Sequence, residues 1–182
     1  MPPDQQKFVE WIDLCHGALF KHALWMTGNR SLAEDLLQET FYQAWKSRHA
    51  IENETSPLPW LLTILRRALY KELQQTRLET IPLDEQHLEN PQSLASEDLD
   101  MMVDLGKGLM SMSARQRDLL LLHVLHGFSY EQISEQVGIP LGTVMSRISR
   151  ARQVLKVFYA NDDFDEKVVV PFKKKSLKVA PK

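Results

Sequence analysis

The side chains that could carry covalent or metal chemistry in this sequence are six histidines, one cysteine and scattered serines. A metal site needs three or four ligands at defined spacings, and the sequence contains no HExxH or CxxC arrangement. His16 and His22 fall on one expected helix and His123 and His126 on another, with nothing nearby to complete a site. The serines lack a strand-turn-helix elbow. We therefore expect surface or edge histidines, no metal, no cofactor, no small-molecule substrate and no enzyme.

Cys15 lies in an apolar stripe of helical spacing over residues 8–19, within a first helix expected over residues 4–27. We interpret it as a core residue and not as a reactive thiol. A single cysteine forms no internal disulfide and fits a reducing compartment. Apolar runs stay well short of a membrane span, and the first residues do not form a secretory leader. These features predict a cytoplasmic protein without membrane insertion.

Binding to a polyanion is the chemistry that the sequence does support. Residues 141–156 follow the turn at Gly138-Ile139-Pro140 and alternate apolar positions with the cations Arg147, Arg150, Arg152 and Lys156. A basic helix of this kind lies in a DNA major groove between phosphates. The alternative is an ordinary pair of helices with a solvated cationic face. Small residues at the start of the helix favour DNA, because they let the backbone approach it closely.

The elements that must position this helix have their ends encoded nearby. Ser113 with Gln116 and Ser129 with Gln132 form capping boxes, in which a hydroxyl and an amide satisfy the free N–H groups of a first turn. Gly127 and Gly138 are placed to end helices. A short helix at residues 130–136, a tight turn and a second helix make a helix-turn-helix.

A second cationic surface lies on a helix expected from Trp60 to Thr76. Its members recur at offsets of 0, 3, 4, 7, 8 and 11, and we call this surface the basic stripe: Thr63, Arg66, Arg67, Tyr70, Lys71 and Gln74. Cations that follow the backbone and an aromatic that stacks on a base are the means by which proteins hold single strands. Taken singly, such a stripe is more often a solvated face.

An acidic surface is expected on the preceding helix, which a capping box of Ser31 and Glu34 would begin. Asp35, Gln38 and Glu39 project together at i, i+3 and i+4, beside Phe41. We call these four residues the acidic face. From spacing alone, a solvated face near a helix N-terminus is the preferred interpretation, because the helix dipole favours carboxylates there.

Charge divides the chain into segments. Residues 78–105 hold eight acidic residues and no lysine or arginine, whereas residues 106–160 hold seven basic and three acidic ones. We expect an all-α protein of two small helical domains, at residues 1–77 and 101–160, joined by a flexible acidic linker at residues 78–100. A weak helix is expected at residues 97–112. Residues 161–182 form a basic tail, which we interpret as disordered.

Three segments resemble the extracytoplasmic-function (ECF) group of bacterial sigma factors. Their sequences are AEDLLQETFYQAW, PWLLTILRRALYKELQQTR and GFSYEQISEQVGIPLGTVMSRISRARQVL. The resemblance covers roughly residues 11–155. Three positions depart from the family pattern. Met145 stands where a basic residue is common, and Arg67 and Lys71 stand where Asn and Asp are usual.

The resemblance implies a function for each surface. The acidic face would bind core RNA polymerase. The basic stripe, through Thr63, Arg66, Arg67, Tyr70 and Lys71, would hold the opened −10 strand of promoter DNA. The −35 element would be read by the recognition-helix face, which we define as Thr143, Met145, Ser146, Arg147, Ser149, Arg150 and Arg152. The family also implies an anti-sigma factor as partner.

The competing hypothesis is a single-module helix-turn-helix regulator that acts independently of core polymerase. Such regulators usually dimerise, because one recognition helix provides too little affinity. This sequence has no heptad seam, and it offers two different surfaces for DNA. A sigma factor is therefore the preferred interpretation.

Overall fold

The structure is a computed structural model that describes residues 3–48, 56–78 and 105–161. Throughout these ranges the chain is helical or forms turns and loops, without a strand. The labelled helices are α1 Pro3–Thr27, α2 Arg30–Ser47, α3 Leu58–Leu78, α5 Ala114–Val124, α6 Tyr130–Val137 and α7 Leu141–Asn161. Residues 105–110, just before α5, are also helical. The expected all-α class with its helix-turn-helix is confirmed. None of the described helices is long and apolar enough to cross a membrane.

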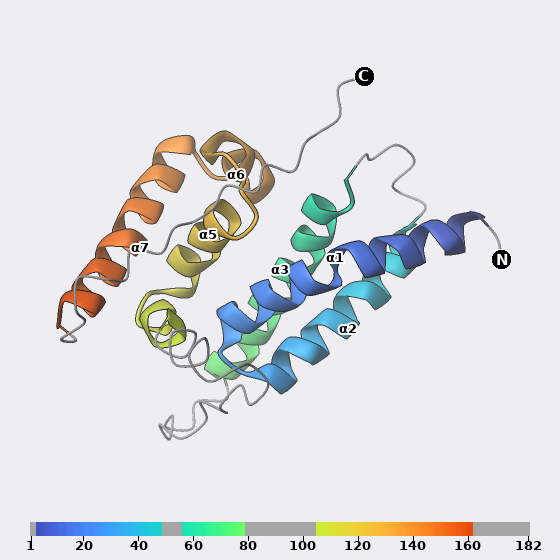
Figure 1. Ribbon diagram of the computed structural model, residues 1–182, viewed down its shortest axis with the longest axis horizontal. Helices are drawn as coiled ribbons and strands as arrows, with labels where there is room; N and C mark the ends of the chain where they lie inside the picture. The colour runs from blue at the N-terminus through green and yellow to red at the C-terminus, as the bar shows by residue number, and fades with distance from the viewer. Residues whose placement is uncertain (1–2, 49–55, 79–104, 162–182) are drawn as a thin grey trace.

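Helices α1, α2 and α3 pack together as an N-terminal unit (Figure 1). Cys15 and Leu19 of α1 are buried in its core, as their stripe predicts. Burial raises the pKa of the Cys15 thiol to about 11, so the thiol stays protonated and unreactive at neutral pH. The α1–α2 corner turns at Gly28, whose φ of +67° is a left-handed conformation that glycine adopts without strain.

The capping box expected at Ser31 and Glu34 is wrong. The N-cap of α2 is Asn29, whose extended backbone follows the Gly28 turn and whose side chain accepts a hydrogen bond from Leu32 N at 2.9 Å. Ser31 lies inside the first turn of α2, where the backbone is already helical and an N-cap cannot form. Glu34 instead accepts from Arg30 Nε at 2.9 Å.

Helices α5, α6 and α7 form the C-terminal unit, and its predicted helix ends are confirmed. Both capping boxes are complete, at Ser113 and at Ser129, and Gly138 ends α6 with a φ of +70°. Val144, Ile148 and Ala151 of α7 are fully buried, so the opposite face of α7 is left to solvent. The short α6 and the tight turn therefore present α7 as a helix-turn-helix does.

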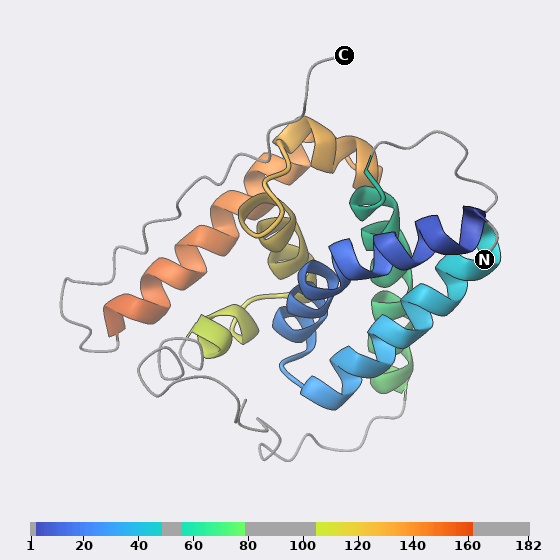
Figure 2. The same ribbon diagram turned by 45° about the vertical axis from the view of Figure 1, so that its right-hand side comes forward.

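The two units are packed against each other, with α5 between α7 and the N-terminal helices in both views (Figures 1 and 2). The four leucines at residues 119–122 are all buried, although one face of a helix could hold only two of them. A helix that is apolar all round is buried on all sides. Here α5 is covered by α7 and α6 on one side and by α1 on the other.

Helix α3 is longer than expected, because it starts at Leu58 and accommodates Pro59 in its first turn, where no N–H partner is needed. Leu62 is also completely buried, although the sequence pattern places it outside the apolar face. The expected linker, the tail and the first part of the helix expected at residues 97–112 lie outside the described residues.

Candidate nucleic-acid interface

The recognition-helix face lies open on α7. Met145, Ser146, Ser149 and Arg150 are exposed, and Met145 keeps 51% of its surface accessible. Arg152 is exposed as well, whereas Thr143 and Arg147 are half-buried. Figures 1 and 2 place α7 on the side of α5 away from the N-terminal helices. The structure thus brings these residues onto a single rigid helix that the N-terminal unit does not cover.

The acidic face is also open. Asp35, Gln38 and Glu39 are exposed on α2, and Phe41 is half-buried beside them. Glu39 accepts a hydrogen bond from Gln43 Nε2 at 2.7 Å, one turn further along the helix. Leu36, Leu37 and Thr40 of the same helix are buried, which fixes the direction in which the acidic face points. A partner could reach these carboxylates without any change in the fold.

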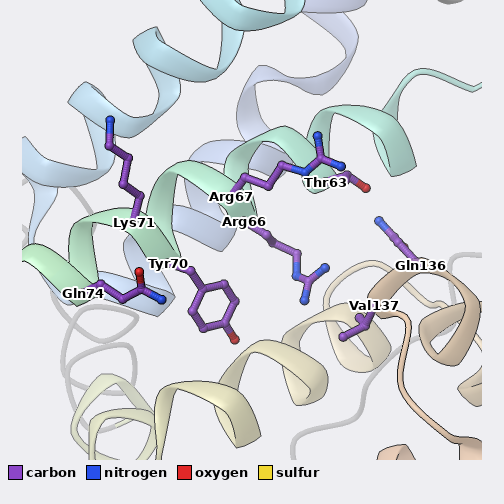
Figure 3. Close-up of a pocket in the computed structure, with 8 residues that line it drawn as sticks. All are labelled: Thr63, Arg66, Arg67, Tyr70, Lys71, Gln74, Gln136 and Val137. Atoms are coloured by element: carbon purple, nitrogen blue, oxygen red, sulfur yellow. The ribbon is translucent and has the colours of Figure 1, made fainter.

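The basic stripe, by contrast, is divided between solvent and the C-terminal unit. Arg67, Lys71 and Gln74 are exposed, Thr63 and Tyr70 are half-buried, and Arg66 is only 9% exposed. In Figure 3, Arg66 and Tyr70 extend from α3 toward α5, while Lys71 extends in the opposite direction. The stripe is therefore continuous along α3, yet two of its members are engaged by another element.

That element contributes Asp118, a carboxylate of α5 that is 1% exposed. Arg66 Nε lies 3.0 Å from Asp118 Oδ1 and 2.9 Å from Oδ2, and Arg66 Nη2 lies 2.8 Å from Oδ2. The Tyr70 hydroxyl donates to Asp118 Oδ2 at 2.9 Å. A guanidinium that meets a carboxylate through two nitrogens in this way forms the strongest class of protein hydrogen bond.

The ionisation of this cluster follows from its contacts. Burial by itself raises the pKa of Asp118, but the imidazole of His22, 3.4 Å away, and the charge of Arg66 outweigh burial and bring the pKa to about 2. Burial acts to lower the pKa of Arg66, and the Asp118 carboxylate outweighs it, so that pKa is raised. Both groups are therefore charged at neutral pH, as an ion pair shielded from water.

The expectation of surface or edge histidines is wrong for His22, which is 0% exposed. Its Nε2 lies 3.4 Å from Asp118 Oδ1, and its Nδ1 lies 3.1 Å from His126 Nε2. The three side chains form a linear series and do not converge on a point. Within the described ranges, no group of three or more His, Cys, Asp or Glu residues is arranged to hold a metal ion.

Three contacts between the units escaped the sequence analysis. Besides Asp118, the Arg117 guanidinium donates to Met26 O at the end of α1 at 2.6 Å, and Gln136 Nε2 donates to Pro59 O at 2.8 Å. One signal was available in the sequence: Arg117 and Asp118 directly precede the four leucines at residues 119–122. Charged residues beside a buried apolar run are themselves drawn out of water, so they need partners. Their hydrogen-bond partners in the other unit lie 48 to 91 residues away in sequence, so periodicity could not identify them.

A cleft of about 470 Å³ remains where the basic stripe meets the end of α6 (Figure 3). All six members of the stripe line it, together with Gln136 and Val137. Arg67 and Lys71 give it positive charge, and Tyr70 gives it an aromatic ring. Such a cleft can admit an anionic, base-bearing ligand from the solvent side.

Family models match both units. The Sigma-70 region 2 model matches residues 11–79, and the Sigma-70, region 4 model matches residues 103–155.

Curated relatives are RNA polymerase sigma factors. The RNA polymerase sigma factor CarQ of Myxococcus xanthus is 32% identical over 133 residues, which are 72% of this chain and 76% of the relative. The ECF RNA polymerase sigma factor SigC of Mycobacterium tuberculosis is 31% identical over 134 residues, 72% of each chain. SigL of the same species is 28% identical over 143 residues, 76% of this chain and 81% of the relative.

Solved structures agree in fold. The sigma factor RpoE in complex with the anti-sigma factor NepR from Bartonella quintana superposes with a TM-score of 0.71 at 29% identity, over 86% of this chain and 99% of that chain. CnrH, solved with the cytosolic domain of CnrY, superposes with a TM-score of 0.65 at 19% identity, over 87% and 90% of the two chains, and shows the shared fold. With an exposed recognition helix, a basic stripe on α3 and matches to both sigma regions, the chain belongs to the ECF group of RNA polymerase sigma factors.

Proposed function

We propose that the chain binds core RNA polymerase through its N-terminal unit and directs it to promoters that both units read. The observation that carries this proposal is the match of two sigma regions to the two helical units, each with a cationic helix. We assign residues 1–77 to core binding and the −10 element and residues 101–160 to the −35 element. Residues 78–100 are the connecting linker. The protein performs no bond chemistry and acts in the cytoplasm, where polymerase and DNA are found.

Reading of the −35 element is assigned to the recognition-helix face. Arg150 and Ser149 are exposed and directly opposite the buried Val144–Ile148 side of α7, so they can enter a major groove while the unit stays folded. Met145, next to Ser146, is an apolar group that suits the methyl of thymine. We infer that Met145 shifts the preferred base relative to relatives with a cation at that position.

Holding the opened −10 strand is assigned to the basic stripe. Its exposed cations Arg67 and Lys71 can follow the phosphates, and Arg66 and Tyr70 can pair with phosphate and stack on a base once they are released from α5. The cleft of about 470 Å³ beside the stripe supports this assignment, because it leaves room for a base.

Control by an anti-sigma factor is also proposed. The RpoE relative was solved in complex with an anti-sigma factor, and this chain covers 99% of that relative at 29% identity. In this chain, such a partner would occlude the recognition-helix face and the acidic face, most of whose residues are exposed. The alternative of a regulator that acts without core polymerase finds no support in these relatives.

The acidic face provides the experiment that tests the proposal. The triple variant Asp35→Ala, Gln38→Ala and Glu39→Ala is expected to abolish assembly with core polymerase. Because all three residues are exposed, the free energy of unfolding should stay within about 0.5 kcal/mol of wild type per site. The measurement is core binding by fluorescence anisotropy, with urea unfolding alongside.

A matched control exists on α1, where Gln6, Glu10 and Asp13 are exposed and present the same one amide and two carboxylates. Their triple alanine variant changes charge and helix propensity in the same way and should assemble normally. Wild-type core affinity in the α2 variant would refute the assignment of the acidic face. Equal losses in both triple variants would show a general charge effect.

A further inference from the structure

Asp118 is a residue of the C-terminal unit that serves the N-terminal unit. It lies on α5, yet its hydrogen-bonding and ion-pair partners among the described residues are Arg66, Tyr70 and His22, from α3 and α1. Separation of the two units would return this carboxylate to water. Burial of an unpaired carboxylate is strongly unfavourable. The partners of Asp118 come from the other unit, so its pairing depends on the contact between the units and not on the fold of its own unit.

The groups that Asp118 engages are those that DNA would need. A guanidinium binds a carboxylate and a phosphate with the same geometry, through two nitrogens facing two oxygens. Two nitrogens of Arg66, Nε and Nη2, bind Asp118, and the Tyr70 hydroxyl donates a hydrogen bond to the same carboxylate. While this contact lasts, Arg66 cannot bind phosphate through these two nitrogens, and Tyr70 is held against α5.

We propose that Asp118 is an internal competitor of promoter DNA, which masks the basic stripe of the free protein and must leave it before the −10 strand can bind. This inference rests on the proposed role of the stripe in holding that strand. The masking acts within the chain and needs no second protein. It concerns the stripe alone, because the recognition-helix face is exposed in the same structure.

Two further hydrogen bonds between the units flank the Asp118–Arg66 contact. Gln136 of α6 donates to Pro59 O at the start of α3, and Arg117 of α5 donates to Met26 O at the end of α1. Leu62, one turn before Arg66 on the same face of α3, is completely buried. The contact is thus an apolar and polar interface of several residues with Asp118 at its centre.

Simultaneous reading of both promoter elements also requires that the units separate. Positions −10 and −35 lie roughly 85 Å apart along B-DNA at 3.4 Å per base pair. A compact chain of this length has a radius of gyration of about 16 Å. The packed arrangement therefore cannot reach both elements at once, and the release of Arg66 and Tyr70 coincides with the separation that promoter binding demands.

The first test measures the contact itself, in the full chain. Cysteines introduced at the exposed Ser47 of α2 and Gln153 of α7 carry a donor and an acceptor dye, while the buried native Cys15 stays unlabelled. Asp118→Asn removes the charge and keeps the shape. We expect high transfer efficiency in wild type and a clear fall in Asp118→Asn. Glu135→Gln is the matched control, because Glu135 is an exposed carboxylate of α6 with the same charge change.

The second test measures what the contact hides. The probe is a fluorescent single-stranded oligonucleotide of about 12 nucleotides. We expect Asp118→Asn to bind it at least about tenfold more tightly than wild type and Glu135→Gln do, equivalent to about 1.4 kcal/mol. Binding of a random-sequence duplex through α7 should be unchanged, because that face is exposed in both states.

Circular dichroism checks that Asp118→Asn is folded. If it is not, Gln136→Ala serves as a second variant for the same test. It removes the bond to Pro59 O at the edge of the interface and should shift both readouts in the same direction by a smaller amount. Wild-type transfer efficiency and wild-type oligonucleotide affinity in both variants would overturn the proposal. Separation of the units without a gain in oligonucleotide affinity would overturn it as well.

The function of the stripe is tested separately by Arg67→Ala with Lys71→Ala in the holoenzyme. Neither residue contacts Asp118 in the described structure, so this variant leaves the mask intact. Loss of promoter opening here, combined with unchanged readouts in Asp118→Asn, would leave the stripe's function standing while the masking fails. Normal promoter opening would instead remove the proposed function of the stripe, and with it the masking.

Discussion

Helices α3 and α7 are built alike and are presented in opposite ways. Each has an apolar side in a helical core and cations on other sides, and each cationic face is assigned to DNA. On α7 the reading residues Ser149 and Arg150 are exposed, whereas on α3 the corresponding Arg66 is 9% exposed and paired with Asp118. The chain thus leaves one of these faces open to solvent and covers part of the other with its own C-terminal unit.

The difference arises from the number of neighbours. Helix α7 packs on α5 and α6 through one side, marked by Val144, Ile148 and Ala151. Helix α3 packs on α1 and α2 through one side and meets the C-terminal unit through a second, where Arg66 is buried against Asp118. A cationic stripe therefore does not reveal whether its charges face water or a carboxylate, and the accessible state of a reading surface is a property of the packed chain.

Removal of one arginine from each helix should sharpen the comparison most. Arg66→Ala leaves the Asp118 charge buried without its main partner, which costs about 3–5 kcal/mol in the closed arrangement. Arg150→Ala removes an exposed side chain and should change the free energy of unfolding by no more than about 0.5 kcal/mol. Hydrogen exchange across α3 and α5, together with urea unfolding, measures both effects.

The Arg66→Ala chain can relieve the cost by opening, in which case amide protection falls at the α3–α5 contact while each unit stays folded. Similar small effects of Arg66→Ala and Arg150→Ala on protection and unfolding would contradict the contrast between a covered and an open helix.

For the free energy of DNA binding measured on promoters, substitution of the exposed α7 arginine should have a larger effect than it has on stability. Arg150→Ala is expected to cost about 1–3 kcal/mol on the preferred promoter and to relax one base position, because its side chain is free to meet a base edge. Lys156→Ala, further along the exposed side, should weaken all sequences alike by loss of a phosphate contact. Holoenzyme binding to a promoter panel distinguishes the two variants. Uniform losses for both would make Arg150 a backbone contact only.

Acidic pH should weaken the contact between the two units, which covers part of the basic stripe. It should leave DNA binding by the exposed face of α7 unchanged. The pKa of His126 is lowered to about 3, first by burial and then by the adjacent His22, with Asp118 acting in the opposite direction. In an opened or unfolded chain, the pKa of a histidine is about 6.5. Because the pKa is lowered in the closed arrangement, the stabilisation is complete above pH 6.5 and is lost progressively as the pH falls toward 3.

Between pH 7 and pH 5 the closed arrangement should lose about 1–2 kcal/mol, measured as transfer efficiency between dyes on the two units. Asp118 does not contribute in this window, because its pKa of about 2 keeps it charged throughout. His126→Gln cannot titrate and should flatten the profile. The duplex affinity of α7, which carries no histidine, is the internal reference. A profile unchanged by His126→Gln would show that another group is responsible.

Local chemistry made much of this fold predictable. The capping boxes at Ser113 and Ser129 and the turn at Gly138 are short-range features, in which residues within four positions satisfy one another's backbone groups. The apolar side of α7 is equally local, because helical periodicity places Val144, Ile148 and Ala151 on one line. The family resemblance of three segments then identified which surfaces to examine.

The predictions from sequence were wrong where residues outside the local pattern decided the structure. Ser31 satisfies the capping pattern, but the Gly28 turn places Asn29 at the helix start instead. His22 lies three residues after Leu19 and four before Met26, so its spacing places it on the buried side of α1; the expectation of an edge position followed its polar side chain, and its partners Asp118 and His126 come from the C-terminal unit. Leu62, which is completely buried, was missed because one-sided amphipathicity is the rule only for a helix with a single packed side.

The sequence by itself determined the helices, the helix ends of the C-terminal unit, the helix-turn-helix and the positions of the cationic faces, because these depend on spacing within a few turns of one helix. Tertiary structure alone decided that Asp118 would meet Arg66 and Tyr70 from 52 and 48 residues away. The reason is physical. A charge's environment is set by whatever chain folds against it, so the same stripe of arginine and tyrosine can be an open DNA surface or half of a buried ion pair.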